Sequence, residues 1–548
     1  MLLIELKNIK KYYGIRLILD IPELKLYSGE CIGIVGANGS GKTTLLDLMA
    51  KNLEPDEGTV NLYDKSGYVS QLKHPLEKAI SSKWASKLSI PDKWSDTMSG
   101  GEKTKFKLAL ELEKNYPLMF ADEPTTNVDI ESISVIEEMF KTYKGTLIVI
   151  SHDRSFLDKL CTQIIEVEDS KVKIYKGNYS DYKAQKEHQK LRAEFEHEEY
   201  IKEKKRLESV MSQTKQKSLS IKKAPKRMGN SEARLHKMGG QKQKAKLDKI
   251  AKSVKTRIEH LEIKEKPKTQ SKIHFDIQGS EKSHSKILIE AKKLNKSFAG
   301  RVIFKDAEFA IENGTKTAIV GANGSGKTTL INMILEKNEQ IKVSKTAKIG
   351  YFNQELKILK PELSIIENVM ENSIYKEDFA RLLLARLLFR GESVYKKAKV
   401  LSGGELVKVS FAKILLEDIN MLILDEPTNY LDISSLEVIE EALIDYDKAL
   451  LFVSHDRKFI SSVANQIIAI EDKKLKLYRG GYEEYLYPIN KVSNKEKTKE
   501  KTKVEEEIIL KNRMAEVIGR LSTQISMEDK ARLDVEYNDI LNKLRALG

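Results

Sequence analysis

The tract GANGSGKT occurs twice in this chain of 548 residues, at Gly36–Thr43 and at Gly321–Thr328. Each copy fits the phosphate-binding pattern of Gly, four residues, Gly, Lys and then Ser or Thr, which follows a β-strand and opens an α-helix. The glycines let backbone N–H groups close around phosphate oxygens at a helix N-terminus, where the helix dipole favours negative charge. Short apolar runs, Cys31–Val35 and Thr317–Val320, precede the two copies, as a buried parallel sheet requires. The repeat therefore predicts an α/β protein with two tandem nucleotide-binding domains.

Particular side chains within each tract have a predicted role. The lysine would reach the β- and γ-phosphates of a nucleotide, and the first threonine would place its hydroxyl on Mg²⁺. The remaining loop residues and the second threonine would surround the phosphates. The predicted phosphate-binding residues are Gly36, Asn38, Gly39, Gly41, Lys42, Thr43 and Thr44 in the first tract and Gly321, Asn323, Gly324, Gly326, Lys327, Thr328 and Thr329 in the second.

Composition fits two domains with extensions. The length exceeds what one core supports, and 40% hydrophobic residues are enough for two cores. No apolar stretch approaches the roughly 20 residues that span a bilayer, and the amino terminus becomes charged too early for a signal peptide. The two cysteines, Cys31 and Cys161, are too few for a zinc site or an iron–sulfur cluster. We expect a cytoplasmic protein without a membrane segment.

Further motifs follow each phosphate-binding tract in the same order. A glutamine at a strand end can contact both Mg²⁺ and the attacking water, and an SGGE tract comes next. An apolar strand then ends in Asp-Glu, where Asp would hold Mg²⁺ through water and Glu would orient or deprotonate the hydrolytic water. A later strand ends in SHDR. Because this ordered series occurs twice, it indicates catalysis, although a lone Asp–Glu pair or His would more often be structural. The residues are Gln71, Ser99–Glu102, Asp122, Glu123 and His152 in the first half and Gln354, Ser402–Glu405, Asp425, Glu426 and His455 in the second.

The series resembles the ATP-binding cassette superfamily over residues 1–182 and 287–488. In that family two cassettes pack head to tail, so that each ATP lies between the P-loop of one cassette and the SGG signature of the other. The resemblance implies intramolecular pairing in a monomer, with Mg²⁺ held near the Thr, Gln and Asp of each set. It makes Glu123, His152, Glu426 and His455 catalytic. The site of Lys42 would be completed by Ser402, Gly403 and Gly404, and the site of Lys327 by Ser99, Gly100 and Gly101.

The adenine base has its own predicted contact. Members of the superfamily stack adenine on an aromatic residue just upstream of the first core strand, a position held here by Tyr13 and Phe298. Tyr12 is an alternative to Tyr13, and either residue is also explained as a packed aromatic. No motif residue is degenerate in either half, so both sites are expected to hydrolyse ATP.

The tract between the cassettes, residues 183–286, predicts a helical hairpin. Neither Gly nor Pro occurs from Lys183 to Ala224 or from Gln241 to Lys266, whereas both occur in the loop expected at 225–240. Apolar residues at helical spacing would face each other along the two helices. The expected seam comprises Leu191, Phe195, Leu207 and Val210 on the outgoing helix and Leu247, Ile250, Val254, Ile258 and Leu261 on the return helix.

This hairpin is strongly basic. From Lys202 to Arg257 there are 19 Lys or Arg against four acidic residues, a local net charge of +15 where the whole chain carries +14. A solvated helix face would carry interspersed acids, and these are scarce. Because such charge is attracted to a phosphate backbone, it favours nucleic acid, and folded RNA in particular, as the partner. The predicted RNA-binding residues are Lys222, Lys223, Lys226, Arg227, Met228, Arg234, His236 and Lys237.

Two intact cassettes and a basic linker resemble the ABC-F family of ribosome-binding ATPases. The tracts FADEPTTN at Phe120–Asn127, YKGNYSDY at Tyr175–Tyr182 and VYKKAKVLSGGE at Val394–Glu405 resemble its Vga-like antibiotic-resistance branch. The resemblance implies binding to the exit (E) site of the 70S ribosome, with the linker reaching toward the P-site tRNA and the peptidyl-transferase centre of 23S rRNA. There the protein would displace an antibiotic, and ATP hydrolysis would release it.

Spacing and composition bear on the alternatives. Gln71 and Ser99 are 28 residues apart, against 48 for Gln354 and Ser402, so the first cassette has no room for the arm that ABC-F translation factors commonly insert. An ABC-F translation factor acting on stalled ribosomes and the ATPase subunit of an ABC transporter remain rival interpretations. DNA is not expected, because the repair ATPases of the superfamily need zinc-binding cysteines. The tail, residues 489–548, predicts a helical extension that is either a ribosome contact or a docked cap.

The charge of the hairpin generates a first prediction. Changing Lys222, Lys223, Lys226 and Arg227 to Gln should weaken ribosome binding and flatten its salt dependence, because each neutralised phosphate contributes roughly one unit to the log–log slope. Cosedimentation with ribosomes over a series of KCl concentrations measures this slope. An unchanged slope would restore the interpretation of a solvated surface.

Overall fold

The computed structural model describes residues 1–70, 75, 77–126, 128–221, 230–264, 285–298, 301–353, 358–428 and 431–486, with the side chains of 230–242 left out. The chain forms one unit from Met1 to Tyr482 and a second from Glu483 to Gly548. The predicted C-terminal helical extension, residues 489–548, lies outside the described residues.

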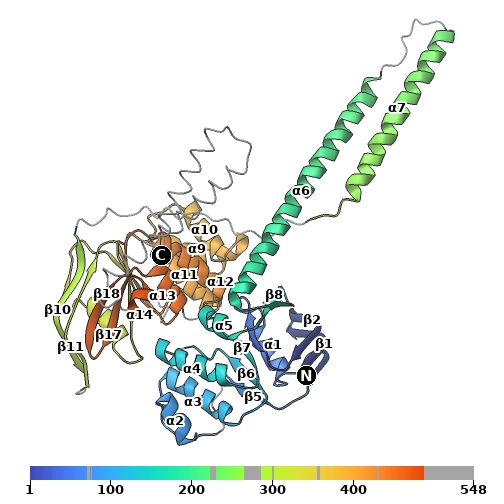
Figure 1. The fold of residues 1–548 in the computed structure, drawn as a ribbon. Coiled ribbons are helices and arrows are strands. Elements are labelled where there is room, and N and C mark those ends of the chain that lie inside the picture. The colour runs from blue at the N-terminus through green and yellow to red at the C-terminus, as the bar shows by residue number, and fades with distance from the viewer. Residues whose placement is uncertain are drawn as a thin grey trace, which may run out of the picture. The chain divides into compact units, whose positions relative to one another are not determined.

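The first cassette combines a mixed central sheet with a separate antiparallel sheet and flanking helices (Figure 1). Its elements are β1 (Leu2–Tyr13), β2 (Arg16–Tyr27), β3 (Cys31–Val35), α1 (Lys42–Met49), β4 (Glu57–Leu62), β5 (Ser66–Val69), α2 (Ser82–Leu88), α3 (Gly100–Glu113), β6 (Leu118–Asp122), α4 (Ile130–Thr142), β7 (Thr146–Ile150), α5 (Arg154–Leu160), β8 (Gln163–Glu168) and β9 (Lys171–Lys176). The central sheet has the order β5-β6-β7-β3-β8-β9, and the antiparallel sheet has the order β2-β1-β4. Strands β6 and β7 are buried throughout, as strands covered on both faces must be.

The second cassette repeats this plan. Its elements are β10 (Ile287–Phe298), β11 (Arg301–Glu312), β12 (Lys316–Val320), α8 (Lys327–Leu335), β13 (Ile341–Val343), β14 (Ile349–Phe352), α9 (Ile365–Met370), α10 (Glu377–Arg386), η1 (Gly391–Tyr395), η2 (Ala398–Val400), α11 (Gly403–Leu415), β15 (Met421–Asp425), α12 (Ile433–Asp445), β16 (Ala449–Val453), α13 (Arg457–Val463), β17 (Gln466–Glu471), β18 (Lys474–Arg479) and α14 (Tyr482–Leu486). The sheet orders, β14-β15-β16-β12-β17-β18 and β11-β10-β13, correspond strand for strand to the first cassette. Helices α9 and α10 precede the second signature, whereas α2 precedes the first, in agreement with the shorter spacing there.

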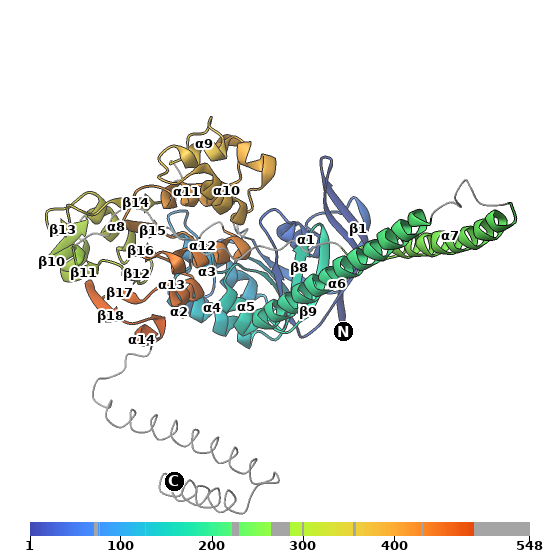
Figure 2. The ribbon, with the colours of Figure 1, turned by 90° about the horizontal axis from the view of Figure 1, so that it is seen from above.

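Two long helices, α6 (Tyr179–Ser220) and α7 (Asn230–Glu259), follow the first cassette and lie side by side (Figures 1 and 2). Helix α6 starts with a capping box between Asn178 and Asp181, directly after β9. The Ser218 Oγ donates to Asp248 Oδ1 at 2.6 Å, and His197 Nδ1 lies 2.7 Å from the Lys264 carbonyl oxygen. Since Ser218, late in α6, contacts Asp248, whereas His197, earlier in α6, contacts Lys264 farther along the chain, the helices are antiparallel, as the sequence predicts.

The loop expected at residues 225–240 is wrong in its second half. Helix α7 begins at Asn230 and runs through Gly239 and Gly240. Each glycine costs a helix about 1 kcal/mol relative to alanine, and the surrounding run of Glu, Ala, Arg, Leu, Lys and Met, all good helix formers, offsets that cost. Arg234, His236 and Lys237 therefore stand on a helix, with side chains that are not described, whereas residues 222–229 lie outside the described part of the chain.

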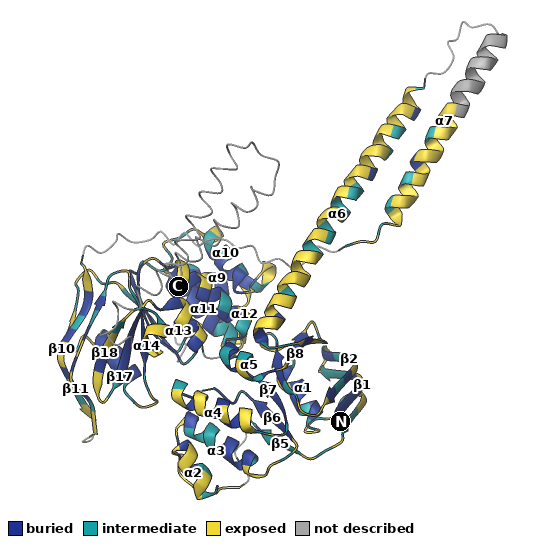
Figure 3. Ribbon diagram, viewed as in Figure 1, coloured by how far each residue is buried: buried dark blue, intermediate teal, exposed yellow. Residues whose placement is uncertain are grey.

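The expected apolar seam is also only partly correct. Leu207 is buried, but Leu191 and Phe195 are exposed by 58% and 64%. Because His197 already contacts Lys264, five residues beyond the end of α7, no return helix lies opposite these two side chains within the described part of the chain. Val210 and Ile250 are partly exposed as well, so much of the hairpin surface faces solvent (Figure 3). None of the helices that the structure describes combines the length and apolar character needed to cross a membrane.

Candidate nucleotide sites at the cassette interface

The first P-loop closes on itself around the lysine that ends it. The Lys42 Nζ donates to the carbonyl oxygens of Gly36 and Ala37 at 2.9 and 3.1 Å. A side chain at Gly36 would bring its Cβ within 2.5 Å of the Val167 carbonyl oxygen, and Gly41 has a φ of 104°, so both positions require glycine. Lys327 makes the equivalent bonds in the second P-loop at 2.9 and 3.2 Å. Both loops thus have the shape of phosphate cradles.

Strands β6 and β15 each end in an aspartate that contacts the first threonine after the P-loop lysine. The Asp122 carboxylate is hydrogen-bonded to the Thr43 hydroxyl, and burial together with neighbouring Glu123 raises the pKa of Asp122 to about 6. Asp425 pairs with Thr328 in the same way, and burial raises its pKa. Adjacent hydroxyl and carboxylate oxygens are the ligand types that Mg²⁺ prefers, so both pairs fit a magnesium ion.

The glutamate after each aspartate is held in a strained conformation next to a histidine. Glu123 and Glu426 have φ angles of 53° and 51°, in the left-handed region that non-glycine residues seldom occupy. The Glu123 N–H donates to the Ile150 carbonyl oxygen on the neighbouring strand at 2.9 Å, and the Glu426 N–H donates to Val453 at 3.0 Å. This bond turns the glutamate side chain away from the strand direction and toward the histidine that follows β7 or β16.

Each glutamate forms a close pair with that histidine. The Glu123 Oε1 lies 3.2 Å from His152 Nε2, and the distance from Glu426 Oε1 to His455 Nε2 is the same. Burial raises the pKa of Glu123 to about 7 and that of Glu426 to about 8. Burial and the P-loop lysine lower the pKa of both histidines to about 4. Two neutral histidines beside carboxyl groups that titrate near pH 7 are suited to accept a proton from water.

Some buried polar atoms of this region have no hydrogen-bond partner among the described residues. They include the hydroxyls of Ser40 and Ser325 in the P-loops. A buried polar atom without a partner is costly. A bound nucleotide and its water would supply the missing partners, so these atoms fit a nucleotide site.

An aspartate from the opposite cassette reaches each P-loop. The Asn38 N–H donates to Asp432 Oδ2 at 3.0 Å, and the Asn323 N–H donates to Asp129 Oδ2 at 3.3 Å. Although burial opposes ionisation, Lys408 and the Asn38 N–H hold the pKa of Asp432 well below its usual range. Neither aspartate was predicted from the sequence to be a site residue. Their signal was the helix N-cap position that both occupy, before α12 and α4.

The signature tracts begin helices α3 and α11. Ser99 and Ser402 cap them, each with a full capping box to the glutamate three residues later. Lys408, on α11, lies 3.9 Å from Asp432, the residue that binds the P-loop of the first cassette. Asp432 thus lies between the signature helix of the second cassette and the P-loop of the first. This is the head-to-tail arrangement expected from the sequence. Direct roles for Gly100, Gly101, Gly403 and Gly404 at the phosphates remain predictions.

Of the residues predicted to contact the adenine base or Mg²⁺, the two aromatic residues are described and the two glutamines are not. Tyr13 and Phe298 stand at the ends of β1 and β10 with 56% and 53% of their surface exposed, which leaves their rings open to a base. The ammonium of Lys296 lies 5.0 Å from the Phe298 ring centroid. Gln71 and Gln354 lie outside the described residues, and their contacts to Mg²⁺ stay predictions.

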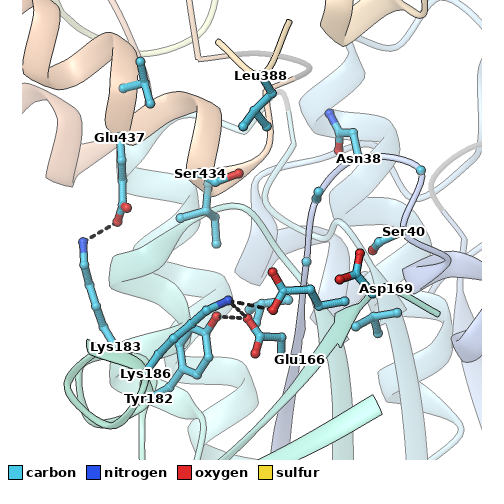
Figure 4. A pocket seen from close by; sticks show the side chains of 18 of the residues that line it. Asn38, Ser40, Glu166, Asp169, Tyr182, Lys183, Lys186, Leu388, Ser434 and Glu437 are labelled. Carbon is cyan, nitrogen blue, oxygen red and sulfur yellow. Dashed lines mark hydrogen bonds and ion pairs between the residues drawn. The ribbon is translucent and has the colours of Figure 1, made fainter. Parts of the chain in front are cut away.

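A cavity of about 940 Å³ borders the first P-loop (Figure 4). The second cassette contributes Ser434 and Glu437 of α12, while the base of α6 contributes Lys183 and Lys186. Lys183 forms an ion pair with Glu437, so the first helix of the hairpin is bound directly to the second cassette. Nothing in the sequence predicts this contact, because it depends on how the two halves pack.

Comparison with known proteins extends these observations. The ABC transporter family profile matches residues 19–126 and 304–429. The chain is similar to the ribosome protection protein VmlR of Bacillus subtilis (strain 168), with 34% identity over 536 residues, which cover 95% of this chain and 93% of that protein. It is equally similar, at 34% identity over 464 residues, to the erythromycin resistance ATP-binding protein MsrA of Staphylococcus epidermidis, over 82% of this chain and 93% of that protein.

Solved structures show a likeness of fold. A chain in the crystal structure of the complex of archaeal ribosomal stalk protein aP1 and archaeal ribosome recycling factor aABCE1 has a TM-score of 0.57 and 20% identity, covering 88% of this chain and 92% of that one. The RNase-L inhibitor gives the same TM-score of 0.57 at 20% identity, over the same shares of the two chains.

The buried glutamates generate a second prediction. The double change Glu123→Gln, Glu426→Gln should keep ATP binding, because the P-loops are untouched, and should lower turnover at least about a hundredfold, the lower range of general-base contributions. A fluorescent ATP analogue measures binding and phosphate release measures turnover. Turnover equal to that of the parent protein would refute the assignment of these carboxylates.

The head-to-tail geometry generates a third prediction. Ser402→Arg should impair hydrolysis at the Lys42 site, which faces α11, and should leave ATP binding at the Lys327 site intact. Photocrosslinking with 8-azido-ATP followed by peptide mapping separates the two sites. Ser99→Arg is the matched variant and should give the opposite pattern. Loss at the P-loop of the same cassette would contradict composite sites.

Proposed function

Because the chain belongs to the ABC-F family of tandem ATP-binding cassette ATPases, we propose that it protects the ribosome from antibiotics that act at the peptidyl-transferase centre. The observation that carries this proposal is the likeness to VmlR and MsrA over most of the chain, since one is named for ribosome protection and the other for erythromycin resistance. The basic hairpin supplies the physical means, because 19 Lys or Arg against four acids between Lys202 and Arg257 attract an RNA backbone.

ATP hydrolysis would take place at two sites, each built from both cassettes. Lys42 would bind the β- and γ-phosphates, and Glu123, beside His152, would orient and deprotonate the attacking water. Thr43 and Asp122, with Gln71 from outside the described residues, would hold Mg²⁺, which neutralises charge on the phosphate oxygens. Lys327, Thr328, Gln354, Asp425, Glu426 and His455 would act in the same way at the other site. Asp432 and Asp129 would make each site sensitive to the approach of the opposite cassette, because each aspartate accepts a backbone N–H group of the opposite P-loop.

The hairpin is anchored where cassette closure can move it. Its first helix starts directly after β9, and Lys183 near its base pairs with Glu437 on α12 of the second cassette. Lys186 is bound to Glu166 on β8 of the first cassette. A helix of 42 residues extends roughly 63 Å at about 1.5 Å per residue. A small rotation between the cassettes would therefore be amplified at the hairpin tip.

We place this tip at the ribosomal peptidyl-transferase centre, next to the P-site tRNA and 23S rRNA, with the cassettes in the exit (E) site. In the ATP-bound form the tip would shift tRNA and rRNA and so displace a bound drug. Hydrolysis would then open the cassettes and release the protein. The expected location is cytoplasmic, where ribosomes are.

The tip itself generates a fourth prediction. The Ser218–Asp248 hydrogen bond clasps the hairpin below its end, so residues 222–243 can be replaced by a short Gly-Ser turn with the clasp intact. This variant should keep ATP hydrolysis and most of its ribosome association, yet lose drug protection. Protection is scored as the minimum inhibitory concentration in cells that express parent or variant at matched levels.

The control and the outcomes separate the rival functions. Changing exposed Lys255 and Glu259 on α7 to Gln preserves net charge and the tip, and should leave resistance unchanged. Full resistance with the shortened tip would reject this form of the proposal. If neither parent nor variant protects cells but both bind ribosomes, a translation factor acting on stalled ribosomes is the better interpretation. Sedimentation with membranes instead of ribosomes would favour a transporter subunit.

A further inference from the structure

The SHDR tracts contain an aspartate and an arginine that the catalytic scheme leaves unused. Arg154 follows His152 by two residues in the first cassette, and Arg457 follows His455 by two residues in the second. Both arginines are buried, with 6% and 8% of their surface exposed. A buried guanidinium is costly unless carboxylates surround it, so the positions of its partners are informative.

These partners belong to the opposite cassette. The Arg154 Nη2 donates to Glu440 Oε2 on α12 at 2.7 Å and lies 3.8 Å from Asp456 Oδ2. Arg457 Nη2 donates to Glu137 on α4 and lies 3.6 Å from Asp153 Oδ2. The two sets are equivalent, with each residue of one set at the corresponding position of the other cassette in the second set. Together these six residues form a crossed cluster at the interface.

Each aspartate of the crossed cluster is bound to a catalytic loop. Asp153 directly follows His152, and its Oδ1 accepts the Phe156 N–H at 3.0 Å as the N-cap of α5. Asp456 directly follows His455 and accepts the Phe459 N–H at 3.0 Å as the N-cap of α13. In each aspartate, one carboxylate oxygen therefore caps the helix that follows the catalytic histidine. The other oxygen faces an arginine of the opposite cassette.

The crossed cluster also contains polar atoms that could form further hydrogen bonds. The Asp153 Oδ2 and the Nε atoms of Arg154 and Arg457 are buried and have no hydrogen-bond partner among the described residues. The arginine–aspartate separations of 3.6 and 3.8 Å exceed a hydrogen bond. A slightly closer approach of the cassettes would turn these separations into charge-assisted hydrogen bonds.

From this geometry we propose that Arg154 and Arg457 are positioning residues that act across the interface. Each arginine fixes the aspartate next to the catalytic histidine of the opposite cassette, so that neither hydrolytic centre is complete until both cassettes have closed. Arg154 thus serves the site of Glu426 and His455, and Arg457 serves the site of Glu123 and His152. The proposal rests on the ATPase activity and does not depend on the ribosomal role.

Hydrolysis at one site at a time tests the proposal. In a Glu123→Gln background only the Lys327 site turns over, and in a Glu426→Gln background only the Lys42 site does. Single-turnover rates are measured with ³²P-labelled ATP. Arg154→Gln should slow the Lys327 site about tenfold, equivalent to about 1.4 kcal/mol, and should affect the Lys42 site much less. Arg457→Gln should show the reverse.

The pattern distinguishes this role from a local one. Arg154 lies two residues from His152, so a merely structural disturbance would slow the Lys42 site of its own cassette most, and this result would overturn the proposal. An equal loss at both sites would overturn it too, since that would indicate a general contribution to the interface. The control is Arg479→Gln, an exposed arginine on β18 paired with Glu312, which should change neither rate.

A conservative variant keeps the test valid if loss of a buried arginine prevents folding. Arg154→Lys retains the charge, but a single ammonium cannot contact Glu440 and Asp456 as a guanidinium does. Variants are first compared with the parent by thermal melting and by binding of a fluorescent ATP analogue. Among variants that bind the analogue normally, Arg154→Lys should again slow the Lys327 site more than the Lys42 site, and the opposite order would reject the proposal.

Discussion

Each P-loop of this protein is touched by an aspartate from the other half of the chain. Asp432 accepts the Asn38 N–H at 3.0 Å, and Asp129 accepts the Asn323 N–H at 3.3 Å. The backbone N–H groups of a P-loop are also the groups that bind phosphate. A ligand bound in either cradle would therefore lie next to an aspartate of the opposite cassette. The signature helices, the crossed cluster and the anchor of the hairpin all depend on this facing arrangement.

Burial at that interface explains the electrostatics of the sites. Glu123 and Glu426 lie inside the protein, and this burial raises their pKa to about 7 and about 8, while the neighbouring histidines are lowered to about 4. At the same interface the buried arginines Arg154 and Arg457 are surrounded by carboxylates of the opposite cassette. Glu123 and Glu426 are the carboxyl groups predicted to accept a proton from water, whereas Glu440 and Glu137 accept hydrogen bonds from the arginines of the opposite cassette.

The hairpin differs from the cassettes in its exposure, its apolar contacts and its charge. Its surface is largely exposed, its apolar seam is short, and its net charge is high. A helix pair of this kind gains little from its own core, whereas its base buries Tyr179 and Tyr182 and forms the ion pairs Lys183–Glu437 and Lys186–Glu166. The net positive charge of the hairpin sequence would attract a polyanion. Attachment at one end and net positive charge along the remainder support the role proposed for the hairpin.

Much of this protein could be predicted from local sequence, because the relevant interactions are local. A P-loop is a strand, a glycine turn and a helix within about fifteen residues, so Gly36–Thr43 and Gly321–Thr328 predicted both cassettes and their phosphate cradles. Absence of Gly and Pro predicted the hairpin. The end of its loop was misplaced, because Gly239 and Gly240 are tolerated inside a helix of otherwise strong formers.

Contacts between residues distant in the sequence were decided only by the tertiary structure. The pairs Arg154–Glu440 and Arg457–Glu137 join residues that are 286 and 320 positions apart. No periodicity or spacing encodes such a pair, because it exists only when two complementary surfaces, each folded on its own, are brought together. The left-handed φ of Glu123 and Glu426 is likewise fixed by a bond to the neighbouring strand. Sequence thus determined which chemistry each cassette carries, and packing decided how the two cassettes share it.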